Sequence, residues 1–245
     1  MGYLPVLTFH RVLAEEPTRG VDPRRISVSS RQFRRHLRLL RGLGYRTILL
    51  NDYIAMLRAG KSPRPRTFGI TFDDGYQDNL TLGVPILKEC GFTAAVFAVS
   101  GELGGMNRWD DGQARLMTVT ELQEWRRAGM EVGAHTAHHP HLTQLSISQA
   151  RLEMASSKDV LEAALGQRVG LLAYPYGESN ADIRRLVQEI GFDAAFSTDH
   201  APSDHATDLF QLRRSVVFPR NNFWNIWWKA QRWYPHYQDW LRRGR

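Results

Sequence analysis

The alternation of apolar, strand-like runs with amphipathic helical runs constrains the fold of this chain more than any other feature. Turn residues separate the two kinds of run along the whole sequence. Such alternation predicts a mostly parallel sheet, because each helix returns the chain to the edge where the next strand begins. For a chain of 245 residues, it predicts an α/β fold with a closed or nearly closed barrel.

The predicted elements belong to one domain, because no internal repeat or interdomain linker interrupts them. Strands are expected at residues 4–9, 45–50, 67–72, 93–99, 130–134, 169–174, 192–197 and 212–218. Helices are expected at residues 30–41, 52–59, 79–89, 118–128, 146–165 and 181–189. We assign residues 1–222 to this domain and residues 223–245 to a Trp- and Arg-rich helical extension.

Polar residues follow the carboxyl ends of several predicted strands. They are His10, Asp73, Asp74, His135 and Tyr176. Barrel folds gather their catalytic groups at this face, since all parallel strands end on the same side. Core packing would not place polar side chains in this way, so the sequence predicts a functional site here.

An acidic pair, Asp73 and Asp74, ends the apolar run 67–72 and is followed by Gly75. Where a strand breaks into a loop, both carboxylates can turn toward one pocket. The competing interpretation is structural, with Asp73 capping the next helix and Asp74 filling a turn. Taken alone, the sequence Asp-Asp-Gly favours that structural interpretation.

Four histidines crowd into residues 135–141, directly after another predicted strand. His135 and His139 stand four residues apart, a spacing at which two imidazoles can share a metal ion. A surface cluster is the alternative interpretation, and His138 and His141 are rival ligands. Two histidines and one aspartate would leave coordination positions of zinc open for water and substrate, as a catalytic site requires.

Two further segments are candidates for the same site. Residues 173–177, Ala-Tyr-Pro-Tyr-Gly, form an aromatic turn after a predicted strand. A backbone N–H in this turn could bind an oxyanion, or the turn could simply pack. The Gly-rich loop 100–117 holds Trp109, Asp110 and Asp111, and loops of this length in compact domains are often functional.

Together these segments resemble the polysaccharide deacetylases, the NodB-homology family of metal-dependent amide hydrolases. Residues 71–76, 135–140 and 173–177 match its three motifs in order, and the resemblance covers nearly the whole chain. It implies a distorted (β/α) barrel of about seven mostly parallel strands. It also implies metal ligation by Asp74, His135 and His139, general base catalysis by Asp73, and an oxyanion donor and groove wall at Tyr176. Substrate contacts are expected from Tyr76, Tyr174, Pro175, Trp109 and Arg213.

The chain departs from the family pattern at two places. Many family members carry an arginine where this chain has Ala173, and that arginine orients the catalytic aspartate; Arg213 and Arg214 are the candidates to replace it. The family's late Leu-His motif is absent near the C-terminus, but residues 7–10, Leu-Thr-Phe-His, resemble it. This permuted order is similar to the branch that acts on poly-N-acetylglucosamine.

The expected reaction is hydrolytic N-deacetylation of an N-acetylhexosamine residue in a glycan. A metal ion would polarise the amide carbonyl while Asp73 accepts a proton from water. The departing amine needs a proton, and His10 is the available acid. Zinc (Zn2+) is the expected ion, although Co2+, Ni2+ or Fe2+ suits the same ligands.

Other functions stay open on the sequence alone. An O-acetyl sugar esterase or a small-molecule amidase could use the same metal site. A catalytically silent glycan-binding protein is a further alternative, which the missing arginine at Ala173 suggests.

The net charge of +7 and the isoelectric point near 9.8 favour anionic surroundings. Lys and Arg are scattered without a nucleic-acid motif, so no nucleic-acid partner is expected. The resemblance implies an acetylated glycan as the partner. The segment after Asn222 is rich in tryptophan, with Trp224, Trp227, Trp228, Trp233 and Trp240. It predicts either a packed last helix or a face for peripheral membrane or glycan contact.

No run approaches the roughly 20 apolar residues of a membrane span, and Met1 to Phe9 is too short for a signal peptide. As written, the chain is expected to be cytoplasmic or membrane-peripheral, and extracytoplasmic if its N-terminus has been trimmed. The single cysteine, Cys90, excludes an intramolecular disulfide and a Cys-based zinc site.

Overall fold

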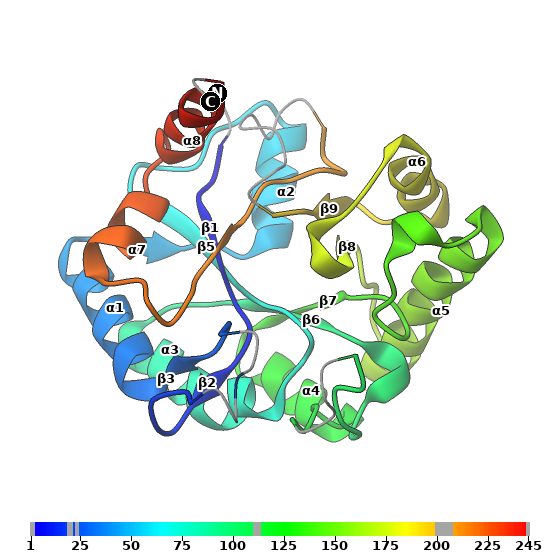
Figure 1. Ribbon diagram of the computed structural model, residues 1–245, viewed down its shortest axis with the longest axis horizontal. Helices are drawn as coiled ribbons and strands as arrows, with labels where there is room; N and C mark the ends of the chain where they lie inside the picture. Colours follow the sequence, from blue (N-terminus) through cyan, green and yellow to red (C-terminus); the bar gives the residue numbers. More distant parts are fainter. Residues whose placement is uncertain (1–2, 19–21, 23–24, 110–113, 199–207, 244–245) are drawn as a thin grey trace.

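The structure is a computed structural model that describes residues 3–18, 22, 25–109, 114–198 and 208–243. Its centre is a curled parallel sheet with the strand order β10-β1-β5-β6-β7-β8-β9 (Figure 1). These strands are β1 (Val6–Phe9), β5 (Thr67–Phe72), β6 (Ala95–Ala98), β7 (Glu131–Ala134), β8 (Leu171–Ala173), β9 (Ala194–Phe196) and β10 (Ser215–Val216). A short strand, β4 (Arg46–Thr47), pairs with the first part of β5. This sheet confirms the predicted distorted barrel.

The barrel is nearly closed where the chain enters β10. On one side, Ser215 of β10 pairs with Leu7 of β1. On the other side, Leu212 forms a parallel bridge with Phe196 at the end of β9. The segment before β10 therefore connects the two ends of the curled sheet. Outside it, β2 (Val12–Leu13) and β3 (Val28–Ser29) form a separate two-stranded sheet.

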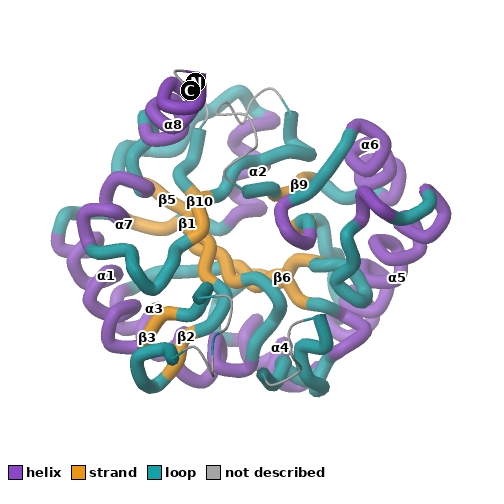
Figure 2. Tube along the Cα trace, viewed as in Figure 1, coloured by secondary structure: helices purple, strands orange, loops and turns teal. Residues whose placement is uncertain are grey.

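Helices surround the sheet in the described part of the chain (Figure 2). They are α1 (Ser30–Gly42), α2 (Leu50–Arg58), α3 (Val84–Cys90), α4 (Val119–Arg127), α5 (Ile147–Leu165), α6 (Ala181–Ile190), α7 (Phe223–Lys229) and α8 (Tyr234–Arg243). Capping explains where several begin. Thr118 and Glu121 form a reciprocal capping box at α4, as the sequence predicts, and Ser29 accepts a hydrogen bond from the backbone N–H of Gln32 at α1.

Several elements differ from the sequence prediction, which did not include β2 and β3 and made β10 longer than it is. The strand expected at 45–50 is shorter, because the buried carboxylate of Glu131 accepts the backbone N–H groups of Leu50 and Asn51 and so starts α2 early. The helix expected at 79–89 opens with a π-helical turn, η1 (Asn79–Gly83). The C-terminal extension forms two helices, α7 and α8, where one packed helix was an expectation.

Strand side chains alternate between the helix layer and the barrel interior. Phe9 lies in the helix layer, with its ring centroid 5.0 Å from that of Phe33 and 5.8 Å from that of Phe72. Thr8 and Thr71 have the opposite orientation, and the Thr71 hydroxyl donates a 3.0 Å hydrogen bond to that of Thr8. The interior below the end of β5 is therefore partly polar, which matters for the site described next.

Helix α7 packs on the barrel through Ile226, which is fully buried in the same apolar core as Phe33 of α1. The domain boundary at residue 222 stays a prediction. Within the described residues, none of the helices combines the length and the apolar character needed to cross a membrane.

Candidate active site

The acidic pair lies where β5 ends, as predicted from the sequence. The backbone N–H of Asp73 still bonds to the carbonyl of Phe9, whereas Asp74 and Gly75 have left-handed φ angles of 73° and 83°. This turn sends the Asp74 carboxylate in a new direction, and Gly75 fits because a Cβ there would lie 3.3 Å from Ala98. Both aspartates are buried. Asp73 caps no described helix, so the capping interpretation of Asp73 is wrong, whereas Asp74 does lie in a turn, as that interpretation expected.

His135 and His139 converge on the Asp74 carboxylate. Their Nε2 atoms lie 3.4 Å and 3.3 Å from the same oxygen, Oδ1 of Asp74. The three side chains can offer one ligand atom each, all within 4.8 Å of one another, and all three are buried. His139 takes a left-handed φ of 59°, and its N–H bonds to the Thr136 hydroxyl. The geometry therefore brings together the three residues predicted to bind a metal ion.

The second nitrogen of His135 explains how its ring is oriented. Its Nδ1 lies 2.8 Å from the carbonyl oxygen of Ala173, at the end of β8. A carbonyl can only accept, so Nδ1 carries a proton, and Nε2 is the nitrogen that faces Asp74 and that the neutral ring would offer to a metal ion. This partner is a backbone atom of a neighbouring strand, and no sequence pattern could have revealed it.

The rival ligands His138 and His141 are held elsewhere. Nδ1 of His138 lies 2.8 Å from Glu153, and Nδ1 of His141 lies 3.0 Å from Glu178. The His141 ring also stacks on Tyr176, with a centroid separation of 3.8 Å. Neither histidine belongs to the cluster around Asp74, which leaves His135 and His139 as the pair that faces it.

Asp73 is held by Arg214. The guanidinium Nη1 and Nη2 of Arg214 lie 2.6 Å and 2.8 Å from the two Asp73 oxygens, and Arg214 is fully buried. It also bonds to the Thr71 hydroxyl and to the carbonyl of Ser197, both at 3.2 Å. Arg214 therefore occupies the orienting role left open by Ala173.

The neighbouring Arg213 turns to the other side. Its guanidinium donates 2.8 Å hydrogen bonds to Asp239 and Gln238 of α8, and the side chain is fully buried. Because its charge is neutralised inside the protein, this placement does not support the predicted contact between Arg213 and substrate.

Charges around the two aspartates keep both ionised. Burial alone would raise the pKa of Asp73, but the Arg214 guanidinium and the nearby His135 hold that pKa below its usual value. Burial also opposes ionisation of Asp74, yet the bond to His135 and the charge of His139 lower its pKa. Burial disfavours protonated His135, but the bond to Asp74 and the Asp73 charge raise its pKa.

His10 lies directly after β1 and affects the pKa values of the two aspartates. Its charge in the protonated form lowers the pKa of both Asp73 and Asp74, which places the imidazole close to the acidic pair. Its Nδ1 atom is buried and has no hydrogen-bond partner among the described residues. The carbonyl of His10 accepts a 2.7 Å hydrogen bond from Asn79, which fixes the backbone there.

Two aromatic rings flank His139. The Trp109 ring stacks on it with a centroid separation of 4.7 Å, and the Tyr176 ring meets it edge-on, also at 4.7 Å. Tyr176 lies in the short 3-10 turn η4 (Pro175–Gly177) with a left-handed φ of 57°. Strained residues cluster at functional sites. Asp110 and Asp111 of the Trp109 loop lie outside the described residues.

The remaining predicted substrate-binding residues are buried. Tyr76 packs beneath the Arg11 guanidinium, 5.4 Å from its ring centroid, and the Tyr174 hydroxyl donates a 2.7 Å hydrogen bond to the carbonyl of Phe210. Burial raises the pKa of the Tyr174 hydroxyl. Pro175 is buried as well. These positions support packing beneath the site and do not support direct contact with a glycan.

The fold and the site together define a hydrolase of the deacetylase-barrel type. The family model for polysaccharide deacetylases matches residues 60–195, more than half of the chain, so the protein belongs to the polysaccharide deacetylase family.

Relatives and solved structures agree with this assignment. The chain is 26% identical to YxkH of Bacillus subtilis over 216 residues, covering 88% of this chain and 72% of that protein. It is 23% identical to a poly-beta-1,6-N-acetyl-D-glucosamine N-deacetylase of Staphylococcus epidermidis, covering 86% and 78% of the two chains. The fold is similar to that of the Streptococcus pyogenes deacetylase PplD, with a TM-score of 0.82, 24% identity and coverage of 93% and 98%.

Proposed function

We propose that the protein is a metal-dependent N-deacetylase of N-acetylhexosamine residues in a polysaccharide or oligosaccharide. The observation that carries this proposal is that a potential metal site and an ionised carboxylate lie side by side where the parallel strands end. Asp74, His135 and His139 form a potential metal site, and the adjacent Asp73 is an ionised base held by Arg214. The relative from Staphylococcus epidermidis, whose name gives N-acetylglucosamine as its substrate, supports the choice of sugar amide.

The three converging side chains fit a divalent metal ion. The His135 tautomer fixed by Ala173 leaves Nε2 as a ligand atom, and Asp74 is ionised. We expect zinc, although Co2+, Ni2+ and Fe2+ accept the same ligands. When bound, such an ion supplies a Lewis acid that polarises the acetamide carbonyl.

Asp73 acts as the general base in this proposal. It takes a proton from the attacking water, and the two bonds from Arg214 keep its carboxylate from rotating. Those bonds also lower its basicity, so orientation and proton affinity are balanced against each other. A backbone N–H in the turn at Tyr176 is the proposed donor to the developing oxyanion.

His10 completes the reaction as the general acid. Water oxygen forms a bond to the acetyl carbon, the carbon–nitrogen bond breaks, and the amine leaves with a proton from His10. The products are acetate and a free hexosamine amino group. The position of His10 at the end of β1, next to the strand that ends at the two aspartates, supports this role.

The finding on Arg214 weakens the alternative of a silent glycan-binding protein. That alternative rested on the missing arginine at Ala173, and Arg214 makes the bonds that such an arginine would make. The same groups can hydrolyse amide and ester substrates, so the test compares the two.

Acetate release from matched substrates tests the proposal. The N-acetyl form of a glucosamine oligomer should release acetate, and an O-acetylated oligomer of the same length should react more slowly. Asp73→Asn serves as the inactive control, because it keeps the shape of the site and removes the base. Faster release from the O-acetyl substrate would make the protein an esterase, and no release from either would favour the silent binding protein.

A further inference from the structure

A continuous strip of exposed apolar side chains covers the outer surface of α7 and α8. We define the aromatic strip as six residues that are between 39% and 68% exposed: Trp224, Trp228, Trp233, Tyr237, Trp240 and Leu241. Successive rings from Trp228 to Trp240 lie 6.1 to 6.4 Å apart, centroid to centroid. Soluble proteins seldom leave so large a contiguous apolar surface in water.

The spacing of these residues places them on one face. Trp224 and Trp228 are four residues apart on α7, and Tyr237 and Leu241 are four apart on α8. The opposite faces are used for packing, by the buried Ile226 on α7 and by Asp239, which is bound to Arg213, on α8. The aromatic strip is therefore the outward side of helices that are already docked on the barrel.

A cationic loop lies beside the aromatic strip. The guanidinium of Arg232, between α7 and α8, donates hydrogen bonds to the carbonyls of Pro63 and Arg64 and so fixes the loop 61–66 there. Arg66 and Trp233 line the same surface cavity, which has a volume of about 750 Å³. Lys61, Arg64 and Arg66 are all exposed.

Acidic residues are scarce in both segments. None occurs in the sequence between Asp52 and Asp73, and the one acid from residue 209 to residue 243 is Asp239, which pairs with the buried Arg213. The aromatic strip therefore combines indoles with a neighbouring loop that carries three exposed cations, Lys61, Arg64 and Arg66.

We propose that the aromatic strip and the loop 61–66 bind the surface of an anionic lipid bilayer. Indole and phenol rings are favoured at the depth of lipid headgroups, and lysine and arginine beside them are attracted to anionic lipids. The catalytic rim stays accessible in this arrangement. Helix α7 contacts α1 and α8, whereas the candidate metal site forms where β5 and β7 end (Figure 1).

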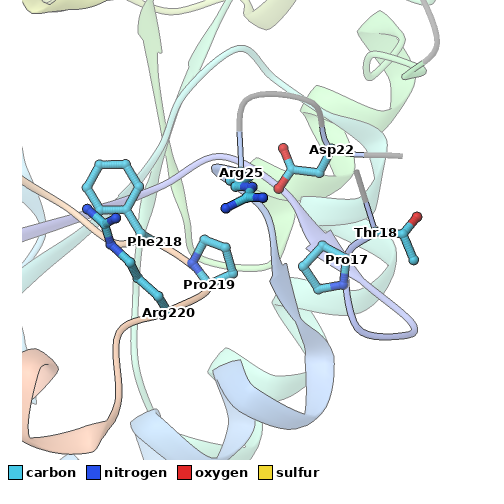
Figure 3. Close-up of a pocket in the computed structure, with 7 residues that line it drawn as sticks. All are labelled: Pro17, Thr18, Asp22, Arg25, Phe218, Pro219 and Arg220. Atoms are coloured by element: carbon cyan, nitrogen blue, oxygen red, sulfur yellow. The ribbon is translucent and has the colours of Figure 1, made fainter. Parts of the chain in front are cut away.

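Another surface cavity is a weaker candidate for a binding site. The cavity between the loop of Pro17 and the segment Phe218 to Arg220 contains two exposed arginines, Arg25 and Arg220 (Figure 3). No described polar group is buried there without a partner and directed at a ligand. The aromatic strip is therefore the surface whose chemistry selects one kind of partner.

Vesicle sedimentation with the full chain tests the proposal. Binding is expected to vesicles of phosphatidylcholine and phosphatidylglycerol at a ratio of about two to one, and only weakly to phosphatidylcholine alone. The double variant Trp224→Ala/Trp240→Ala should partition at least about tenfold more weakly. Leu152→Ala on α5 is the matched control, because Leu152 is 67% exposed and Trp240 is 68% exposed.

Charge variants test the cationic loop separately. Arg64→Gln should weaken partition by about fivefold, since one cation near an anionic surface contributes about 1 kcal/mol. Arg127→Gln is the control, because Arg127 is exposed on α4, away from α7 and α8. Salt should weaken wild-type binding and have less effect on Arg64→Gln.

Circular dichroism and acetate release from a soluble oligomer verify that each variant is folded. The proposal is overturned if the wild-type chain does not bind the anionic vesicles, or if the tryptophan variant binds as well as the wild type. It is also overturned if analytical ultracentrifugation shows a wild-type dimer that this variant converts to a monomer without any change in vesicle binding. That result would make the aromatic strip an interface between copies of the chain.

Discussion

Arg214 donates a hydrogen bond to each carboxylate oxygen of Asp73 inside the barrel, although the two residues are 141 positions apart in the sequence. The arginine comes from the segment that closes the barrel before β10, and the aspartate comes from the end of β5. A two-point contact of this kind fixes a carboxylate in rotation as well as position. The closure of the barrel and the orientation of the proposed base are therefore one structural feature.

Replacement of Arg214 should impair catalysis without removing the metal site. Arg214→Lys keeps a cation but cannot make two parallel bonds, and we expect kcat to fall by about 10- to 100-fold. Metal content should be unchanged, because the cluster around Asp74 does not include Arg214.

The pH profile distinguishes this role from a general loss of stability. Arg214 lowers the pKa of Asp73, so Arg214→Gln raises that pKa, and activity should be lost at a higher pH as the solution is acidified. The matched control is Arg213→Lys, which alters an equally buried arginine bound to α8. The role of Arg214 would be contradicted if Arg213→Lys lost activity at a higher pH than wild type on acidification and Arg214→Gln did not.

His10→Ala should leave the fold and the metal content intact and lower kcat by about 10²- to 10⁴-fold, the range typical of lost acid catalysis. The loss should shrink for aryl acetates, because their leaving groups depart without a proton. His138→Ala is the control, since His138 is an exposed histidine bound to Glu153. Undiminished deacetylation of a sugar amide by His10→Ala would exclude His10 from the mechanism.

His36 provides a test of stability against pH that is independent of catalysis. Burial in α1, with a smaller contribution from Arg35, lowers the pKa of His36 from 6.5 to about 4. The folded state therefore binds fewer protons than the unfolded state between these values, and stability is lost as the pH falls from 6.5 toward 4.

The loss is measurable as a difference between two proteins. Between about pH 7.5 and about pH 5, wild type should lose about 2 kcal/mol of unfolding free energy more than His36→Leu does. Urea denaturation at both pH values gives this difference. An equal loss in the two proteins would mean that His36 is not responsible.

Much of the site was predictable because its residues follow strand ends. Asp74, His135 and His139 lie at the carboxyl ends of β5 and β7, where the alternation of strands and helices must gather them. The choice of His139 over His138 and His141 depended on the family resemblance, because spacing alone left all three open.

Other parts of the site could not be predicted from the sequence. The choice between Arg213 and Arg214 depends on which of two adjacent side chains faces the barrel interior, and the chain is irregular just before β10. The carbonyl of Ala173 carries no side-chain signal at all. Tyr76 and Tyr174 were expected to contact substrate because they belong to the motifs, yet both are almost fully buried.

Metal content measured together with acetate release tests the central claim most directly. Wild-type protein stripped with a chelator should release no acetate from an N-acetylglucosamine oligomer, and stoichiometric Zn2+ should restore release. His135→Ala and His139→Ala should each fail to retain the metal, whereas Asp73→Asn should retain it and stay inactive. Undiminished acetate release by the stripped protein, or full metal content in both histidine variants, would contradict a catalytic metal site at Asp74, His135 and His139.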